Sequence, residues 1–146
     1  SSAASDVYKR QELKPLVRAS FVVDTLTYLY RGGRCSGLAA LAGGALKLHP
    51  RIGVEDGKMG PGKKYRGNME KVVLSYVKDM EEAMKNARPE RVFITHSGSA
   101  PEIVDKVRAY LNDLHVFREI LETRAGGVVS SHCGPGTLGV LFIAKE

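Results

Sequence analysis

The 146-residue chain has no tryptophan and only two cysteines, and aromatic residues make up 7% of it. Cys35 and Cys133 lie far apart without the short spacing of metal ligands, so the sequence predicts two reduced thiols and no metal site. No apolar run approaches the roughly 20 residues that a membrane-spanning helix needs. No charged leader precedes a hydrophobic run, so we expect no secretory signal and a cytoplasmic location.

Acidic residues are fewer than basic ones, 16 against 22, which gives a formal net charge of +6 with neutral histidines. A positive excess suits an anionic partner, but a solvated surface of mixed sign gives the same total. Four basic side chains gather in a predicted loop: Lys58, Lys63, Lys64 and Arg66. Because few aromatic residues and no nucleic-acid-binding signature accompany them, we expect no nucleic acid partner.

Near the C-terminal end, the residues from Ser131 to Gly139 contain the spacing G-x-G-x-x-G, which is typical of dinucleotide-binding loops. That fingerprint follows a strand, opens a helix and has an acidic partner roughly 20 residues later. Here only the run from Val140 to Glu146 follows, and its apolar character predicts a closing strand. The dinucleotide interpretation therefore fails. What remains is a flexible loop that places His132 beside a tight backbone turn.

The first eleven residues, Ser1 to Gln11, are small and polar and show no hydrophobic periodicity. We interpret residues 1–11 as a non-native tail and residues 12–146 as one domain. A hydrophobic content of 43% allows that domain one sizeable core. On this interpretation the chain is a fragment of a longer protein, and the domain that precedes it is missing.

The first half of the domain predicts helices and a hairpin. Asp24 is a suitable N-cap for a helix over Thr25–Arg31, which ends at a double glycine. The segment Ser36–Leu48 is apolar on nearly every side, as in a buried helix. The alternation of Arg51–Glu55 before an Asp-Gly turn indicates a hairpin.

The second half predicts alternating helices and strands. Asn68 caps a helix whose apolar residues recur at helical spacing as far as Met84. The further predicted elements are a strand at Arg91–His96, a helix from a capping box at Ser99–Glu102 to about Leu114, and a strand through Phe117–Thr123. Alternation of this type favours an α/β fold in which helices pack on a mixed sheet.

Several of these motifs together resemble the DegV family. Val23–Arg34 is similar to the family's helix and glycine-arginine signature. The Ala- and Gly-rich segment, Leu48–Pro50, Glu55–Lys58 and the His132-x-Gly-Pro-Gly loop follow in the family's order and spacing. The resemblance covers Leu16–Glu146 and corresponds to the C-terminal domain of a two-domain DegV-like protein, whose N-terminal domain is absent here.

The resemblance implies a lipid-binding protein without catalysis of its own, the acyl-carrying subunit of a bacterial fatty acid kinase. Such a protein binds a long-chain fatty acid, its only implied ligand, and presents the carboxylate to a separate kinase catalytic subunit for acyl-phosphate formation. Transient contact with a membrane surface belongs to the same expectation. By their places in the family's motifs, Arg34 and His132 lie near the acid headgroup, and Ser131 is compatible with a headgroup contact. The family often has lysine where this chain has His49.

Simple energetics assign different roles to the headgroup and the tail. A guanidinium presents several donors to a carboxylate, and an imidazole adds one more. At about 0.8 kcal/mol per methylene, burying about fourteen methylenes gives roughly 11 kcal/mol gross, against about 1.5 to 3 kcal/mol for a charged hydrogen bond. We expect the tail to dominate affinity and the headgroup to set orientation. The predicted tail lining is Leu26, Leu29, Leu38, Leu41 and Leu46.

Each of these residues also has a simple structural interpretation, and the same motifs allow one alternative to the fatty-acid-binding function. Taken alone, Arg34 suits a helix C-terminus and His132 a loop residue bonded to backbone, while His96 is interpreted as structural. Cys133 lies next to His132, but no third orienting group is evident, so we expect no thiol catalysis. The alternative function is a small-molecule enzyme with His132 as general base and the Gly134–Gly136 amides as an anion site.

Overall fold

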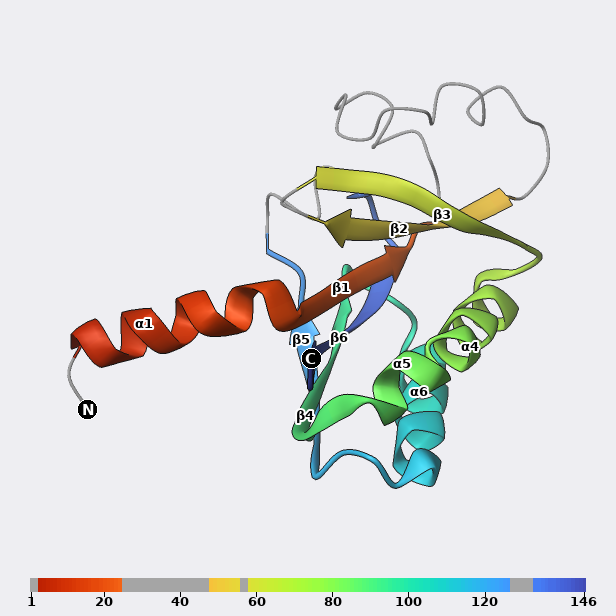
Figure 1. Ribbon diagram of the computed structural model, residues 1–146. Coiled ribbons are helices and arrows are strands. Elements are labelled where there is room, and N and C mark those ends of the chain that lie inside the picture. Colours follow the sequence, from red (N-terminus) through yellow and green to blue (C-terminus); the bar gives the residue numbers. More distant parts are fainter. Residues whose placement is uncertain (1–2, 25–47, 56–57, 127–132) are drawn as a thin grey trace.

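The computed structural model describes residues 3–24, 48–55, 58–126 and 133–146, which form one mixed sheet with helices (Figure 1). The strand order is β3-β2-β1-β6-β4-β5. The strands are β1 (Val17–Val22), β2 (Leu48–Glu55), β3 (Lys58–Arg66), β4 (Ala87–His96), β5 (Glu119–Arg124) and β6 (Leu138–Ala144). The helices are α1 (Ala3–Leu13), the short 3-10 helix η1 (Lys14–Leu16), α4 (Met69–Asp79), α5 (Glu81–Lys85) and α6 (Pro101–Leu114). The predicted α/β fold with a mixed sheet is confirmed.

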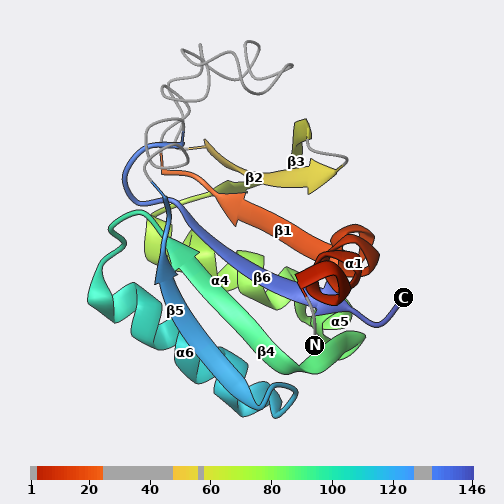
Figure 2. The same ribbon diagram turned by 90° about the vertical axis from the view of Figure 1, so that its left-hand side faces the viewer.

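Helices α4, α5 and α6 all lie on one face of the sheet (Figures 1 and 2). Strands β4 and β5 are parallel and α6 connects them, as the alternation of elements predicts. The other neighbouring strands pair antiparallel. In Figure 2 the sheet lies in front of α4, α5 and α6, so its opposite face is turned toward the viewer. Among the described residues, no helix packs on this opposite face. This face is called the open face below.

The main core lies between the sheet and helices α4 and α6. Asn68 caps α4 as predicted, because its side chain accepts a hydrogen bond of 2.9 Å from the amide of Lys71. The helix then places one apolar stripe on the sheet. The buried residues of the two helices are Val72, Val73, Tyr76 and Val77 of α4 and Val104, Val107 and Leu111 of α6. Each such side chain contributes about 1.5 to 3 kcal/mol when fully buried.

A tyrosine hydroxyl from α4 enters the sheet itself. Tyr76 is 0% exposed, and its hydroxyl donates to the carbonyl oxygen of Ser20 at 2.9 Å while it accepts from the amide of Val140 at 3.0 Å. Ser20 and Val140 face each other across β1 and β6, so the hydroxyl bridges the two strands. The Ser20 hydroxyl lies 2.8 Å from it. Burial raises the pKa of Tyr76 to about 12, so it stays protonated as this bridge requires.

The third glycine of the G-x-G-x-x-G spacing serves strand packing. A Cβ atom at Gly139 would collide with the carbonyl oxygen of Ser20 and lie 2.9 Å from the Cβ of Phe21. Strand β6 therefore approaches β1 closely at this point, and only a residue without a side chain fits. Strand packing therefore explains why this position is a glycine, and no bound nucleotide is needed to explain it.

The basic segment predicted as a loop is strand β3. It pairs with β2 in the predicted hairpin, with Glu55 opposite Lys58 and His49 opposite Tyr65. Strand β3 is an edge strand, so it can contain lysines and a proline. Charged residues and proline on an edge strand also oppose pairing with other chains. These charged residues and the proline led to the prediction of a loop where the structure has an edge strand.

Two helix starts differ from the sequence-based expectation. The predicted capping box at Ser99–Glu102 is wrong: the N-cap of α6 is Ala100, which makes no side-chain cap, although Pro101 takes its predicted first-turn place. The amide of Ser99 instead donates to the ring of His96. The polar N-terminal residues form α1, which projects away from the sheet (Figure 1). The non-native origin of residues 1–11 stays a prediction.

We predict that Tyr76→Phe lowers the free energy of unfolding by about 1 to 3 kcal/mol, because it leaves the Ser20 carbonyl and the Val140 amide without their partner. Urea denaturation measures this change. The matched control is Tyr110→Phe, whose half-buried hydroxyl lies near Glu81 and whose loss costs less than about 1 kcal/mol. Equal costs for the two variants would contradict a strand-bridging role.

We further predict that Gly139→Ala lowers the free energy of unfolding by more than about 3 kcal/mol or prevents folding, since the added methyl group meets backbone that cannot move aside. Gly60→Ala is the control, because a Cβ there meets nothing within 4 Å. Circular dichroism during urea titration follows both variants. A Gly139→Ala protein as stable as Gly60→Ala would show that β6 does not approach β1 in this way.

Candidate functional site

One edge of the sheet collects most of the segments that carry the family motifs, while Glu55–Lys58, at the turn from β2 to β3, lies at the opposite edge. Strand β6 is antiparallel to both β1 and β4, and β4 is parallel to β5. Strands β1, β4 and β5 therefore end at the edge where β2 and β6 begin. The connections 23–47, 97–100 and 125–137 all start or finish there. We call it the motif edge.

The predicted site residues themselves lie outside the described residues. These are Arg34, Ser131 and His132 for the headgroup and Leu26, Leu29, Leu38, Leu41 and Leu46 for the tail. Their roles stay predictions. The described residues show how the chain is held on both sides of the segments that contain them.

A glycine-proline turn leads the chain from the His132 segment into β6. Gly134 and Gly136 have φ values of +81° and +80°, in the region that favours glycine, and Pro135 lies between them. This pattern is typical of a type II turn, which takes proline second and glycine third. The hydroxyl of Thr137 donates to the carbonyl oxygens of Cys133 and Gly134, both at 3.1 Å.

Ser97, the residue after β4, binds this turn. Its hydroxyl donates to the carbonyl oxygen of Gly134 at 2.6 Å and accepts from the amide of Thr137 at 3.2 Å. Its own amide donates to the carbonyl oxygen of Thr137 at 2.9 Å, and its carbonyl oxygen accepts from the amide of Gly136 at 3.1 Å. No sequence motif singles out this serine.

The end of β1 lies against the same turn. A Cβ atom at Gly136 would come 3.1 Å from the Cβ of Asp24 and 3.3 Å from its Oδ2. Asp24 immediately precedes the segment with Arg34, and Gly136 closely follows the segment with His132. The described residue before the Arg34 segment and the described turn after the His132 segment thus lie side by side.

His49, at the start of β2, is a structural link at this edge. It is buried, and its Nδ1 and Nε2 lie 3.0 Å and 3.1 Å from the carbonyl oxygens of Val23 and Gly67. It therefore joins the end of β1 to the connection between β3 and α4. Both ring nitrogens are occupied by the backbone.

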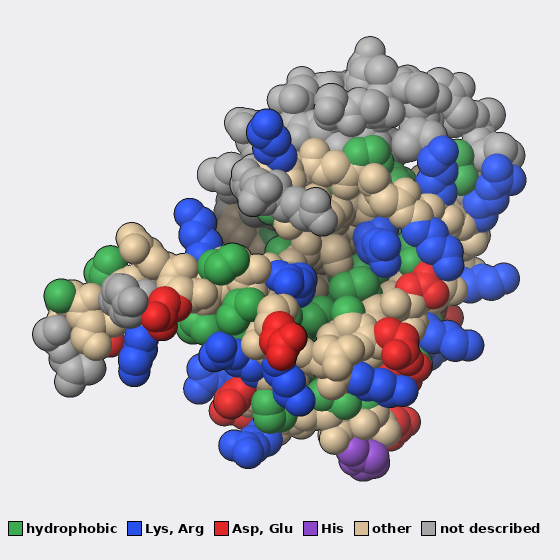
Figure 3. Space-filling view, in the orientation of Figure 1, with side chains coloured by type: hydrophobic (Ala, Val, Ile, Leu, Met, Phe, Trp, Pro, Cys, Tyr) green, Lys and Arg blue, Asp and Glu red, His purple; other side chains and the backbone are tan. Residues whose placement is uncertain are grey.

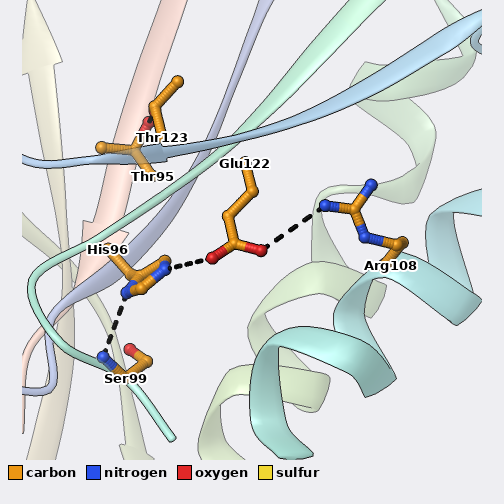
Figure 4. A network of polar contacts seen from close by, with 6 residues as sticks. All are labelled: Thr95, His96, Ser99, Arg108, Glu122 and Thr123. Carbon is orange, nitrogen blue, oxygen red and sulfur yellow. Dashed lines mark hydrogen bonds and ion pairs between the residues drawn. The ribbon is translucent and has the colours of Figure 1, made fainter. Parts of the chain in front are cut away.

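His96 is engaged on both sides as well (Figure 4). Its Nε2 lies 2.9 Å from Oε2 of Glu122, and its Nδ1 accepts from the amide of Ser99 at 3.1 Å. Arg108 of α6 reaches the other carboxylate oxygen at 3.6 Å. The hydrogen bond from His96 and the nearby Arg108 guanidinium hold the pKa of Glu122 below its usual range. The contacts agree with the structural interpretation of His96.

Cys133 is a buried cysteine next to the His132 segment. It is buried beside Val23 and Ile52, and burial raises the pKa of its thiol to about 11. A protonated, buried thiol is a poor nucleophile, in agreement with the expectation of no thiol catalysis. In the part of the chain that the structure describes, no three metal-ligating side chains come together, and no helix is long and apolar enough to cross a membrane.

The open face of the sheet is apolar. Along β6, Phe142 and Ala144 are buried on the helix side, while the alternating Leu141 and Ile143 are only half-buried. A hollow of about 380 Å³ lies over the far end of this face. Its lining is Val17, Arg88, Glu90, Arg91, Phe93, Leu141, Phe142 and Ile143. This hollow and the motif edge lie at opposite ends of β6.

Several basic side chains gather over β3 and α4, and others are scattered over the rest of the face that Figure 3 shows. Lys63 pairs with Asp79 at 2.7 Å, and the hydroxyl of Tyr65 donates to the same carboxylate oxygen at 2.6 Å. These contacts hold the pKa of Asp79 below its usual value. Strand β3 is thus joined to α4 through Asp79, while Lys58, Lys64 and Arg66 of this outermost strand are exposed to solvent.

Comparison with known proteins supports the resemblance to the DegV family. A family model described as "Uncharacterised protein, DegV family" matches residues 4–145. A DegV domain-containing protein of Deinococcus radiodurans is 32% identical over 130 residues, which are 89% of this chain and 46% of that protein. The chain spans about half the length of the curated relatives it matches.

Solved structures share the fold. The structure described as "Fatty Acid Binding of a DegV family Protein from Thermus thermophilus" has a TM-score of 0.81 and 26% identity, and the match covers 99% of this chain and 51% of that one. The Streptococcus pneumoniae Fatty Acid Kinase (Fak) B3 protein, loaded with linoleic acid, has a TM-score of 0.82 at 17% identity, over 99% of this chain and 50% of that one. The sequence resemblance is confirmed, and the chain belongs to the DegV family.

Proposed function

We propose that this chain is part of a carrier that binds a long-chain fatty acid, with the carboxylate at the motif edge. The observation that supports this proposal is the close approach of Asp24, which precedes the Arg34 segment, to Gly136, which follows the His132 segment. A guanidinium and an imidazole converging there would bind a carboxylate through charge-assisted hydrogen bonds. Ser131 would add a hydroxyl contact. The Thermus thermophilus relative, whose description names fatty acid binding, supports the ligand class.

The open face supplies a path for the acyl tail. From Leu138 to Ile143, β6 advances about 17 Å at roughly 3.3 Å per residue, from the motif edge to the apolar hollow. Leu141, Phe93 and Ile143 line the sheet side of this path. The five predicted leucines, Leu26, Leu29, Leu38, Leu41 and Leu46, would cover the tail from the other side. Burial of the tail, at about 0.8 kcal/mol per methylene, supplies most of the affinity.

The carrier would have no catalysis of its own and would present the carboxylate to a separate kinase subunit, which forms the acyl phosphate. The fold shared with the Streptococcus pneumoniae Fatty Acid Kinase (Fak) B3 protein supports this role. Among the described residues, the thiol of Cys133 is protonated and His96 has both ring nitrogens engaged. We place the carrier in the cytoplasm, with transient contact to a membrane surface during lipid exchange.

The alternative, an enzyme that binds an anion on the Gly134–Gly136 amides, has less support. The amide of Gly136 already donates to Ser97, and Pro135 has no N–H. The next amide, that of Thr137, donates to the Ser97 hydroxyl. Few donors therefore remain in this turn for a phosphate or carboxylate.

We predict that long-chain fatty acid co-purifies with the full-length protein and is recovered by solvent extraction and mass spectrometry. Arg34→Ala and His132→Ala each weaken palmitate binding about tenfold to one-hundredfold, because each removes a charge-assisted hydrogen bond worth about 1.5 to 3 kcal/mol. Isothermal titration calorimetry of the delipidated protein measures the affinity.

Two control variants lie away from the motif edge. Arg118→Ala removes an exposed guanidinium, and His115→Asn replaces an exposed histidine at φ +54° by a residue that tolerates this backbone. Both should bind palmitate as the unmodified protein does. Absence of extractable fatty acid, together with unchanged palmitate affinity in both site variants, would refute the carrier function.

A further inference from the structure

The connection between β4 and α6 holds the turn beside the predicted headgroup site through one residue, Ser97. All three of its polar groups contact that turn. The amide donates to Thr137, the carbonyl oxygen accepts from Gly136, and the hydroxyl contacts both Gly134 and Thr137. Four hydrogen bonds thus join Ser97 to a stretch of four residues.

The hydroxyl takes part in the turn itself. In a β-turn the carbonyl of the first residue commonly accepts from the amide of the fourth, here Gly134 and Thr137. Ser97 Oγ donates to that carbonyl at 2.6 Å and accepts from that amide at 3.2 Å, so it bridges the two groups. A side chain from another loop therefore closes the turn.

The preceding backbone is held with it. The Thr137 hydroxyl donates to the carbonyl oxygens of Cys133 and Gly134 at 3.1 Å each. Cys133 is buried against Val23 and Ile52, at the end of β1 and in β2. The conformation from Cys133 to Thr137 is thus fixed by side-chain hydroxyls and by burial, and His132 is the residue immediately before it.

We infer that Ser97 is a positioning residue for fatty acid binding, which acts by fixing the point where His132 leaves the motif edge. This inference rests on the proposed function. Ser97→Ala removes the bridge and frees the turn, whereas Ser97→Thr keeps a hydroxyl. Ser97 itself need not touch the ligand.

The test compares two ligands that share a tail and differ in the headgroup. Palmitate and its methyl ester are titrated into the delipidated full-length protein by calorimetry. Ser97→Ala should weaken palmitate binding about twofold to tenfold, the effect of one neutral hydrogen bond, and leave methyl palmitate binding unchanged. Ser97→Thr should restore palmitate affinity. The matched control, Ser99→Ala, keeps the backbone amide that bonds His96 and should bind palmitate normally.

A double-mutant cycle adds the readout that separates positioning from a general structural role. If Ser97 acts through His132, then Ser97→Ala should change palmitate affinity less than about twofold in a His132→Ala background. Urea midpoints of all variants are recorded. Should Ser97→Ala fail to fold, Ser97→Cys, a weaker donor of similar size, takes its place in the cycle.

The outcomes distinguish the inference from the function on which it rests. An equal loss for palmitate and methyl palmitate, or an undiminished effect of Ser97→Ala in the His132→Ala background, overturns the positioning role. Weaker binding in His132→Ala with no effect of Ser97→Ala also overturns it and leaves the carrier function intact. No effect of His132→Ala on palmitate overturns the positioning role, and the carrier function falls with it only if Arg34→Ala is also without effect and no fatty acid is extracted.

Discussion

The entry of β6 into the sheet between β1 and β4 is the constraint on which the rest of the structure depends. At this point β6 approaches β1 so closely that Gly139 has no room for a side chain. Two hydroxyls from other elements bridge backbone groups there: Tyr76 joins Val140 to Ser20, and Ser97 closes the turn before the strand. Because buried backbone polar groups are costly without partners, these bridges fix the position of the strand.

That entry also organises the motif edge. The turn between Gly134 and Thr137 can rest on Asp24 only because β1 ends next to the start of β6. The chain therefore brings together two segments that are far apart in sequence. The same strand separates two environments, a core covered by α4 and α6 and an apolar open face on the other side. A ligand with an anionic head and a long apolar tail matches this combination of edge and face.

Elements with strong local signals were predicted well from the sequence. The predicted helix that Asn68 caps has a regular apolar stripe, although the structure divides it at Met80 into α4 and α5. Helix α6 has a first-turn proline and ends at Leu114 as expected. The parallel pair β4 and β5 follows from the helix between them. Strand β3 was missed because lysines and a proline, acceptable on an edge, imitate a loop, and β1 was not singled out at all.

The site was predictable only through motifs, and its supporting contacts were not predictable. The family signatures predict Arg34 and His132 as headgroup contacts, whereas Ser97 is a lone serine after a strand and has no distinguishing pattern. Its role depends on a turn far along the chain, and local propensity contains no information about such a contact. The same holds for His49, whose ring joins two carbonyl oxygens from separate elements. The capping box failed because the Ser99 amide is used by His96.

The most direct test of the central claim is a crystal structure of the full-length protein with palmitic acid bound. The account predicts the carboxylate at the motif edge, within hydrogen-bonding distance of Arg34 and His132. It also predicts that the acyl chain runs over the open face past Leu141 toward Phe93. A carboxylate at the opposite end of the sheet, or an acyl chain between the sheet and α4 and α6, would contradict the account.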